Sequence, residues 1–267
     1  MLDALRIGEG EDPRLAERET RSRLGLGKKK EGYAALEELK DRIRVLQARL
    51  HGAGEQSVLL ILQGMDASGK DSMIRRVFKG INPQGVIVHP FGRPDDGELA
   101  RDYLWRIHRN VPRRGTIGVF NRSHYEDVGV VRVKQLVPDE VWQRRYRHIR
   151  EFERMLADEG TAVRKLWLHI SYEEQRARLQ RRIDDPERNW KFEFEDIDAR
   201  RDWPLYQAAY EEAIRETSTA HAPWFVIPAD RRWARDVAVA EILVEALEQL
   251  DPQLPAADPR LAGVTIP

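Results

Sequence analysis

The amino-acid sequence predicts an α/β protein: a three-layer sandwich in which helices cover both faces of a mostly parallel, five-stranded sheet. Short apolar runs alternate with longer amphipathic stretches over most of the chain, which is typical of βαβ units. A glycine-rich GxxxxGK loop joins the first of these runs to the helix that follows it. Right-handed crossovers between parallel strands then place helices on both faces.

The length and composition exclude several classes of protein. A chain of 267 residues fits one large α/β domain or two small ones. It has no cysteine, which excludes a disulfide framework, a cysteine-bound metal and a thiol nucleophile. No apolar run approaches the roughly 20 residues of a membrane span. The N-terminus has no basic start followed by an apolar block, so we expect a cytoplasmic protein without a signal peptide or a membrane partner.

The first 30 residues are polar and end in the run Lys28-Lys29-Lys30, so we expect residues 1–32 to form an extended or loosely held N-terminal arm. Residues 33–267 then form a single domain. Apolar residues recur at spacings of three and four over 33–51, which predicts an amphipathic helix. After it, apolar runs predict strands, and periodic stretches predict helices. The strands are expected at 57–63, 86–89, 116–120, 163–170 and 224–227, and the helices at 70–78, 96–110, 138–158, 173–182 and 234–250.

The stretch 184–219 interrupts the alternation of strands and helices. It is polar and aromatic, and it lies between the fourth and fifth predicted strands. We interpret it as a helical insertion, a lid over the sheet edge where ligands bind in open α/β folds. The alternative is an ordinary amphipathic helix pair, and for Tyr206 and Tyr210 core packing is the better interpretation.

The GxxxxGK loop predicts phosphate binding, because it directly follows a buried strand and directly precedes a helix. Glycines allow backbone N–H groups to turn inward around a phosphate, and the helix N-terminus adds partial positive charge. Lys70 adds a full charge. The predicted phosphate-binding residues of this loop are Gly64, Ala67, Ser68, Gly69, Lys70, Asp71 and Ser72.

Two carboxylates in this loop predict a divalent cation. The residue after the lysine of such a loop is normally a Ser or Thr that binds Mg²⁺, but here it is Asp71, and Asp66 lies inside the loop. Both would repel bound phosphates unless a hard cation bridged the oxygens. The alternative for Asp71 is an acidic residue that interacts favourably with the helix dipole.

A second polar cluster, 121–127, follows the third predicted strand, where strand ends line the ligand crevice. Arg122 is placed to clamp a transferring phosphoryl group. Glu126 and Asp127 could hold a metal ion or the acceptor, although such a pair could equally be a solvated turn. The acid often found at this strand end is replaced by Asn121.

Basic residues are concentrated in the middle of the chain, although the net charge is zero. Residues 66–134 contain 13 Lys and Arg against 8 Asp and Glu, whereas residues 192–267 contain 7 against 15. The neutral total argues against nucleic acid as a partner, and the local surplus favours a longer polyanion. Solvated faces of Arg-rich helices are the alternative. The basic candidates are Arg75, Arg76, Lys79, Arg132, Lys134, Arg178, Arg181 and Arg182.

Five ordered segments resemble the polyphosphate kinase 2 family, and the resemblance extends over nearly all of 33–250. The segments are GMDASGKD at 64–71, LWRIHRNVP at 104–112, FNRSHYEDV at 120–128, DDPERNWKF at 184–192 and APWFVIPAD at 222–230. The resemblance implies a P-loop kinase-like fold with a helical lid. It implies transfer of a phosphoryl group from inorganic polyphosphate to a nucleotide with Mg²⁺, or Mn²⁺ in its place. It also implies a homo-oligomer, either a dimer or a tetramer.

The form of the second segment resembles the branch that phosphorylates both nucleoside monophosphates and diphosphates, here AMP and ADP. The resemblance implies that Asp66, Lys70 and Arg122 are catalytic, together with Glu126, which is associated with the use of monophosphates. It implies a lid arginine at Arg182. The sequence differs from the commoner family pattern at Asn121. The implied metal ligands are Asp66, Asp71 and Asp127.

Two rival functions are also compatible with the sequence. An ATP-dependent kinase of a nucleotide or small metabolite would explain the loop equally well, but not the surplus of basic residues. A non-catalytic regulator that binds polyphosphate or nucleic acid would use the loop only as a sensor. Formation of ATP from ADP, Mg²⁺ and polyphosphate distinguishes these possibilities.

Overall fold

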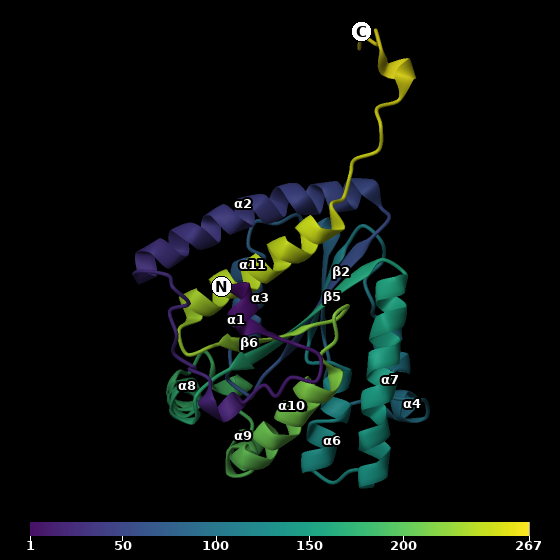
Figure 1. Ribbon diagram of the computed structural model, residues 1–267. Coiled ribbons are helices and arrows are strands. Elements are labelled where there is room, and N and C mark those ends of the chain that lie inside the picture. Colours follow the sequence, from purple (N-terminus) through teal and green to yellow (C-terminus); the bar gives the residue numbers. More distant parts are fainter. Residues whose placement is uncertain (267) are drawn as a thin grey trace.

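A six-stranded sheet lies at the centre of the computed structural model, which describes residues 1–266 (Figure 1). The spatial order of the strands is β1-β6-β5-β2-β4-β3. Neighbours from β6 to β3 are all parallel, and β1 pairs antiparallel with β6. The strands are β1 (Arg6–Ile7), β2 (Ser57–Gln63), β3 (Val86–Pro90), β4 (Ile117–Asn121), β5 (Thr161–His169) and β6 (Trp224–Pro228).

The five predicted strands are confirmed, and β1 is a sixth that the sequence pattern did not predict. All seven residues of β2 are buried, as expected for a central strand covered on both faces. The two residues of β1 are too few to show any period. Their backbone nevertheless pairs with Trp224 and Phe225 at the β6 edge.

Helices cover both faces of the sheet, which gives the expected three layers. Figure 1 shows α2 and α11 on one side and α7 and α10 on the other. Helix α11 packs on α3, β5 and β6, and α2 packs on the outside of α11. The longer helices are α2 (Lys29–Ala53), α3 (Lys70–Val77), α7 (Asp139–Asp158), α8 (Tyr172–Asp184), α10 (Trp203–Thr217) and α11 (Arg232–Leu250).

The helix predicted over 96–110 is replaced by two short helices. An Asp95 capping box with Glu98 starts the first, and the second follows Asp102, whose carboxylate accepts a hydrogen bond from the Leu104 backbone N–H. Such side-chain to backbone bonds compete with a continuous helix. The short helices are α1 (Leu2–Leu5), α4 (Asp96–Leu99), α5 (Trp105–His108), α6 (Val130–Val133) and α9 (Glu195–Arg201), and the 3₁₀ turns include η3 (His124–Asp127) and η4 (Asn189–Lys191).

The N-terminal segment is packed against the domain, although its polar sequence suggests a loosely held arm. Leu5, Ile7 and Leu15 are buried, and the backbone oxygen of Ile7 accepts a hydrogen bond of 2.6 Å from Ser218. The apolar residues lie singly among charges, so no periodic pattern reveals them. Three buried side chains and a paired backbone are enough to fix the segment.

The stretch 184–219 is helical, as expected, and it forms η4, α9 and α10. Tyr206 and Tyr210 of α10 are buried, which confirms core packing for both rings. Trp190 and Phe194, in contrast, are among the most exposed aromatic residues of the described chain. Within residues 1–266, no helix has the length and apolar character that crossing a bilayer requires.

Candidate active site

The phosphate loop lies at the carboxyl end of β2 and leads directly into α3. Gly64 and Gly69 have φ values of +154° and +99°, and a Cβ at Gly64 would lie 2.9 Å from the Leu168 carbonyl oxygen. Neither position accepts a side chain without strain. Ala67, at φ +62°, adopts the left-handed region inside the same loop. Backbone held in this region is typical of ligand-binding loops.

Buried polar groups from α8 and α11 hold the outer side of this loop. Arg178 Nη1 donates to the backbone oxygens of Ala67 (3.1 Å) and Ser68 (2.9 Å), and Arg235 Nη1 also donates to Ser68 O (3.0 Å). Gln175 Nε2 donates to Asp66 O at 3.0 Å. The predicted phosphate residue Arg178 is therefore engaged with the loop backbone itself, where it fixes the shape of the loop.

Lys70 lies at the entrance of α3 with its ammonium group inside the loop. Its Nζ donates to the Gly64 carbonyl oxygen at 2.7 Å. Burial, together with the nearby Arg122 cation, lowers the pKa of Lys70 to about 8, while the Asp66 and Glu126 carboxylates oppose the shift. A bound phosphate would place a negative charge next to this ammonium group and would therefore favour its charged form.

Arg122 connects the phosphate loop to the turn that follows β4. Its Nη2 lies 2.7 Å from Asp66 Oδ1, and its Nη1 lies 3.4 Å from Glu126 Oε2. Its backbone φ is +64°, so the residue after the strand end turns its side chain through an uncommon backbone conformation. The Glu126 carboxylate contributes most to raising the pKa of Arg122, which keeps the guanidinium charged.

Asp71 is held from two elements at the open side of the loop. Asn121 Nδ2 donates to Asp71 Oδ1 at 2.9 Å, and Lys191 of η4 reaches Oδ2 at 3.4 Å. Burial alone would raise the pKa of Asp71, but these two donors lower it overall, so the carboxylate is ionised. Asn121, where the sequence departs from the commoner family pattern, therefore orients a carboxylate.

Asp127 lies on the other side of the same turn. Its Oδ1 is 3.3 Å from Arg145 Nη1 of α7, and Arg145 also donates to its backbone oxygen at 2.8 Å. Burial raises the pKa of Asp127 to about 6, and the Arg145 cation limits the rise. The structure thus brings Asp66, Glu126 and Arg122 together, and it directs Asp127 toward α7.

The carboxylates of the loop fit a magnesium ion that takes some of its ligands from the protein and the others from a substrate. Among residues 1–266 no three His, Asp or Glu side chains are grouped closely enough to bind a metal ion by themselves. Asp66 and Asp71 precede and follow Lys70 at the loop. Mg²⁺ at phosphate sites is typically bound by one or two carboxylates, phosphate oxygens and water. The two loop carboxylates are therefore enough for a magnesium ion that also binds phosphate.

The remaining basic candidates are exposed residues, residues that pair with carboxylates of the 184–219 insertion, and two that pair elsewhere, Arg76 with Asp236 and Arg181 with Glu174. Arg75 on α3 and Lys79 just beyond its C-terminal end are exposed. Ser72, a predicted phosphate-binding residue of the loop, donates from its Oγ to Gly69 O at 2.9 Å. The second group is engaged by carboxylates of the 184–219 insertion. Arg182 lies 3.2 Å from Asp196, Arg132 lies 2.7 Å from Glu212, and Lys134 lies 2.9 Å from Asp202.

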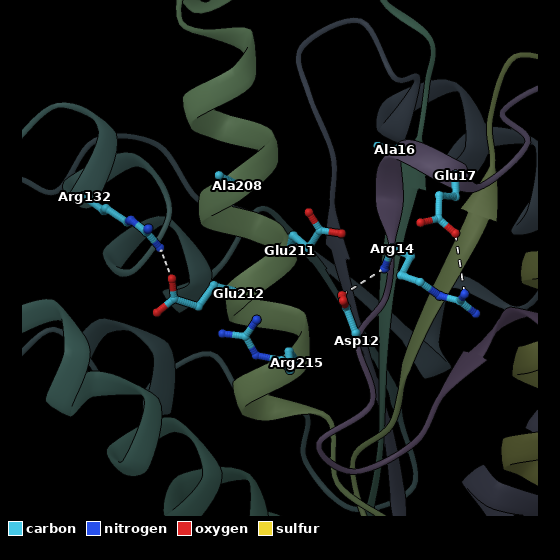
Figure 2. Close-up of a pocket in the computed structure, with 9 residues that line it drawn as sticks. All are labelled: Asp12, Arg14, Ala16, Glu17, Arg132, Ala208, Glu211, Glu212 and Arg215. Atoms are coloured by element: carbon cyan, nitrogen blue, oxygen red, sulfur yellow. Dashed lines mark hydrogen bonds and ion pairs between the residues drawn. The ribbon is translucent and has the colours of Figure 1, made fainter.

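A cavity of about 310 Å³ lies elsewhere, between the N-terminal segment and α10 (Figure 2). Arg132 reaches it, and Figure 2 shows its guanidinium directed at Glu212. The lining is charged on both sides, and much of that charge is paired within the cavity. None of the lining residues belongs to the phosphate loop or to η3. The lining residues are Asp12, Arg14, Ala16, Glu17, Arg132, Ala208, Glu211, Glu212 and Arg215.

Several residues that build the site were not singled out by sequence reasoning. Gln175 and Arg235 hold the loop backbone, and Lys191 contacts Asp71 from the insertion. Lys191 lies in the DDPERNWKF segment, which carries the family resemblance, but the sequence does not show that it contacts Asp71. Arg235 is fully buried on α11 next to Asp236, and a basic-acidic pair on a closing helix gives no signal in the sequence.

Comparison with known proteins agrees with this geometry. A family model described as Polyphosphate kinase 2 (PPK2) matches residues 27–255. An AMP/ADP-polyphosphate phosphotransferase from Meiothermus ruber is 60% identical over 229 residues, which cover 86% of each chain. An ADP-polyphosphate phosphotransferase from Rhodopseudomonas palustris is 41% identical over 266 residues, 95% of this chain and 92% of the relative.

The solved structures lead to the same family. The crystal structure of polyphosphate kinase 2 from Arthrobacter aurescens TC1 superposes with a TM-score of 0.92 at 40% identity, covering 96% of this chain and 92% of the other. The match over residues 27–255 includes the phosphate loop, Arg122 and the whole helical insertion. On these grounds, the chain belongs to the polyphosphate kinase 2 family.

Proposed function

We propose that this chain transfers a phosphoryl group from inorganic polyphosphate to AMP and to ADP, giving ADP and ATP, in a reaction that depends on Mg²⁺. The observation that carries the proposal is the Asp66–Arg122–Glu126 contact, which joins the phosphate loop to a second carboxylate beyond the arginine. The Meiothermus ruber relative, 60% identical, is named for both acceptors.

The residues of the loop are suited to in-line phosphoryl transfer, in which a protein mainly positions groups and balances charge. Backbone N–H groups of the loop and the Lys70 ammonium group hold donor phosphates at the α3 N-terminus. Arg122 spans the gap between the loop and the turn after β4, where its guanidinium can follow the charge on the transferring group.

Asp66 and Asp71 are the proposed ligands of Mg²⁺, with Mn²⁺ as a substitute. When bound, the cation would neutralise part of the negative charge of the phosphates. Asp127 is proposed as a third carboxylate, although its contact with Arg145 would have to open for it to join. Asn121 and Lys191 keep Asp71 ionised and oriented, which is what a metal ligand at this place requires.

Glu126 is proposed to serve the shorter acceptor. A nucleoside monophosphate has one phosphate fewer than a diphosphate, so its attacking oxygen must be brought closer to the donor. Glu126 lies beyond Arg122 as seen from the loop, and its carboxylate can orient cationic groups around that phosphate. Misplacement of a reacting group by about 1 Å can cost roughly 10²-fold in rate.

The test is a reconstituted reaction with purified protein, Mg²⁺, long-chain polyphosphate and either AMP or ADP, with the nucleotides separated by chromatography. We expect ADP and then ATP from AMP, and ATP from ADP, with no product when polyphosphate is omitted or excess EDTA is present. An ATP-dependent kinase would instead need ATP as donor. Binding of polyphosphate without turnover would indicate a regulator. Light scattering tests the expectation of a dimer or tetramer.

A further inference from the structure

Tyr210 of α10 is fixed between the central sheet and the turn that carries Glu126. It is 4% exposed, and its ring stacks on Trp167 of β5 with a centroid distance of 4.5 Å. Gly129, just after η3, lies so close that an added Cβ would be 2.7 Å from the tyrosine Cζ. The ring therefore has no room to move away from the turn without disturbing α6 or β5.

The hydroxyl of Tyr210 reaches the acceptor side of the site. Its Oη donates to Glu126 Oε1 at 3.3 Å, while Glu126 Oε2 lies 3.4 Å from Arg122 Nη1. Arg122 in turn uses Nη2 for Asp66 at 2.7 Å. Burial and the Glu126 carboxylate raise the pKa of Tyr210 well above its ordinary value, so the hydroxyl keeps its proton and remains a donor.

This arrangement divides the two oxygens of Glu126 between two partners. A carboxylate beside a guanidinium tends to form a bidentate pair that uses both oxygens. With Oε1 held by Tyr210, Glu126 offers one oxygen to Arg122 and leaves the second guanidinium nitrogen to Asp66 at the phosphate loop. Without the hydroxyl, Glu126 would be free to turn both oxygens toward Arg122.

We propose that Tyr210 is a positioning residue that sets the acceptor preference of the enzyme, because its hydroxyl holds Glu126 where a nucleoside monophosphate needs it. The proposal rests on the proposed function of this site. It adds a residue that belongs to the helical insertion and whose hydroxyl donates to Glu126, not to the phosphate loop or to Arg122. Its influence passes entirely through the Glu126 carboxylate.

The test compares kcat/KM for AMP and for ADP, with polyphosphate and Mg²⁺, in the wild type and in Tyr210→Phe. A hydrogen bond to a charged group contributes on the order of 1.5–3 kcal/mol, so we expect the value for AMP to fall about tenfold or more and that for ADP about threefold or less. Tyr206→Phe is the matched control, because it removes the same atom from a buried tyrosine one turn earlier on α10. Its AMP to ADP ratio should equal that of the wild type.

A second comparison separates positioning from loss of packing. In a Glu126→Ala background, Tyr210→Phe should leave the AMP to ADP ratio unchanged, since the acceptor of the Tyr210 hydroxyl is then absent. Equal losses for both acceptors in Tyr210→Phe, or full additivity with Glu126→Ala, would overturn the proposal for Tyr210. A wild-type protein that does not phosphorylate AMP would overturn the proposed function itself, which the same assay reveals first.

Discussion

Lys70 carries its charge in surroundings that make the charge costly until a phosphate is bound. Burial and the neighbouring Arg122 cation lower its pKa to about 8, and its nearest acceptor is a neutral carbonyl group, that of Gly64. The loop backbone is held by groups outside the site, so this cost is not relieved by rearrangement. The charge is therefore available for the phosphates of the reaction.

The first prediction concerns removal of this charge. Lys70→Ala should lower kcat by about 10²-fold or more, because one preorganised electrostatic contact in a transition state supplies roughly 2.7–4 kcal/mol. Steady-state rates of ATP formation from ADP and polyphosphate check this. Circular dichroism should show a folded variant. A folded Lys70→Ala protein that keeps more than a third of the wild-type rate would mean that the loop is not the reaction site.

The second prediction concerns pH. Lys70 is charged below its pKa and neutral above it, so kcat/KM for polyphosphate, which reports groups of the free enzyme, should decline as the pH rises through about 8. Bound phosphates favour the charged form, so the decline in kcat should lie at higher pH. Initial rates at saturating and at low substrate give the two profiles. A kcat/KM that stays flat to well above pH 8 would contradict the prediction.

At the scale of elements, the N-terminal segment behaves as part of the domain. It supplies β1 at the β6 edge, and Thr20 Oγ1 donates to Asp230 Oδ2 at 2.9 Å. Asp230 also accepts from the backbone N–H of Ser171, which caps α8, the helix whose Arg178 holds the phosphate loop. The segment is therefore connected to the phosphate loop through Asp230 and helix α8.

The third prediction concerns the anchoring of this segment. Ile7 is 1% exposed, and truncation of a buried Ile to Ala typically costs about 2–5 kcal/mol. Ile7→Ala should therefore lower the free energy of unfolding by about 2 kcal/mol or more, measured by denaturant titration. Ile87→Ala, at an exposed position of β3, serves as the control and should change it little. Equal, small effects of both variants would show that the segment is held loosely after all.

The elements that the sequence predicted are those whose pattern is local. Five strands were found because each is a continuous apolar run, and the phosphate loop because its glycines have fixed spacing. The strand β1 was missed because two residues show no period. The roles of Tyr210 and Arg235 were missed for another reason: each depends on a partner far away in the chain, Glu126 and Ser68 respectively, and no single-sequence pattern records such a pairing.

At the scale of the whole molecule, positive charge is unevenly available, because carboxylates of the insertion neutralise part of it. Arg132, Lys134 and Arg182 each pair with an acidic residue of 184–219. Arg76 pairs with the buried Asp236 of α11. Arg75 and Lys79 remain exposed on the surface of α3 and just beyond it, and no ion pair holds them within residues 1–266. We therefore expect these two residues to contact a long polyanion where it extends beyond the phosphate loop.

The last prediction follows from this distribution. Exposed charges interact over a screening length of about 8–10 Å at physiological ionic strength, so contacts with Arg75 and Lys79 should weaken as salt is added. The KM for long-chain polyphosphate should rise steeply over a series of KCl concentrations. The KM for ADP, which binds on the more enclosed side of Arg122 and Glu126, should rise less. In the double variant Arg75→Glu/Lys79→Glu, the KM for polyphosphate should rise about tenfold or more. Its salt dependence should be shallower, since each lost contact removes a salt-sensitive interaction. Arg147→Glu, an exposed change on α7, is the control and should leave both constants near the wild-type values. Equal salt dependence of the two constants in the wild type, or an equal effect of the α7 control, would show that these basic residues only solvate the surface.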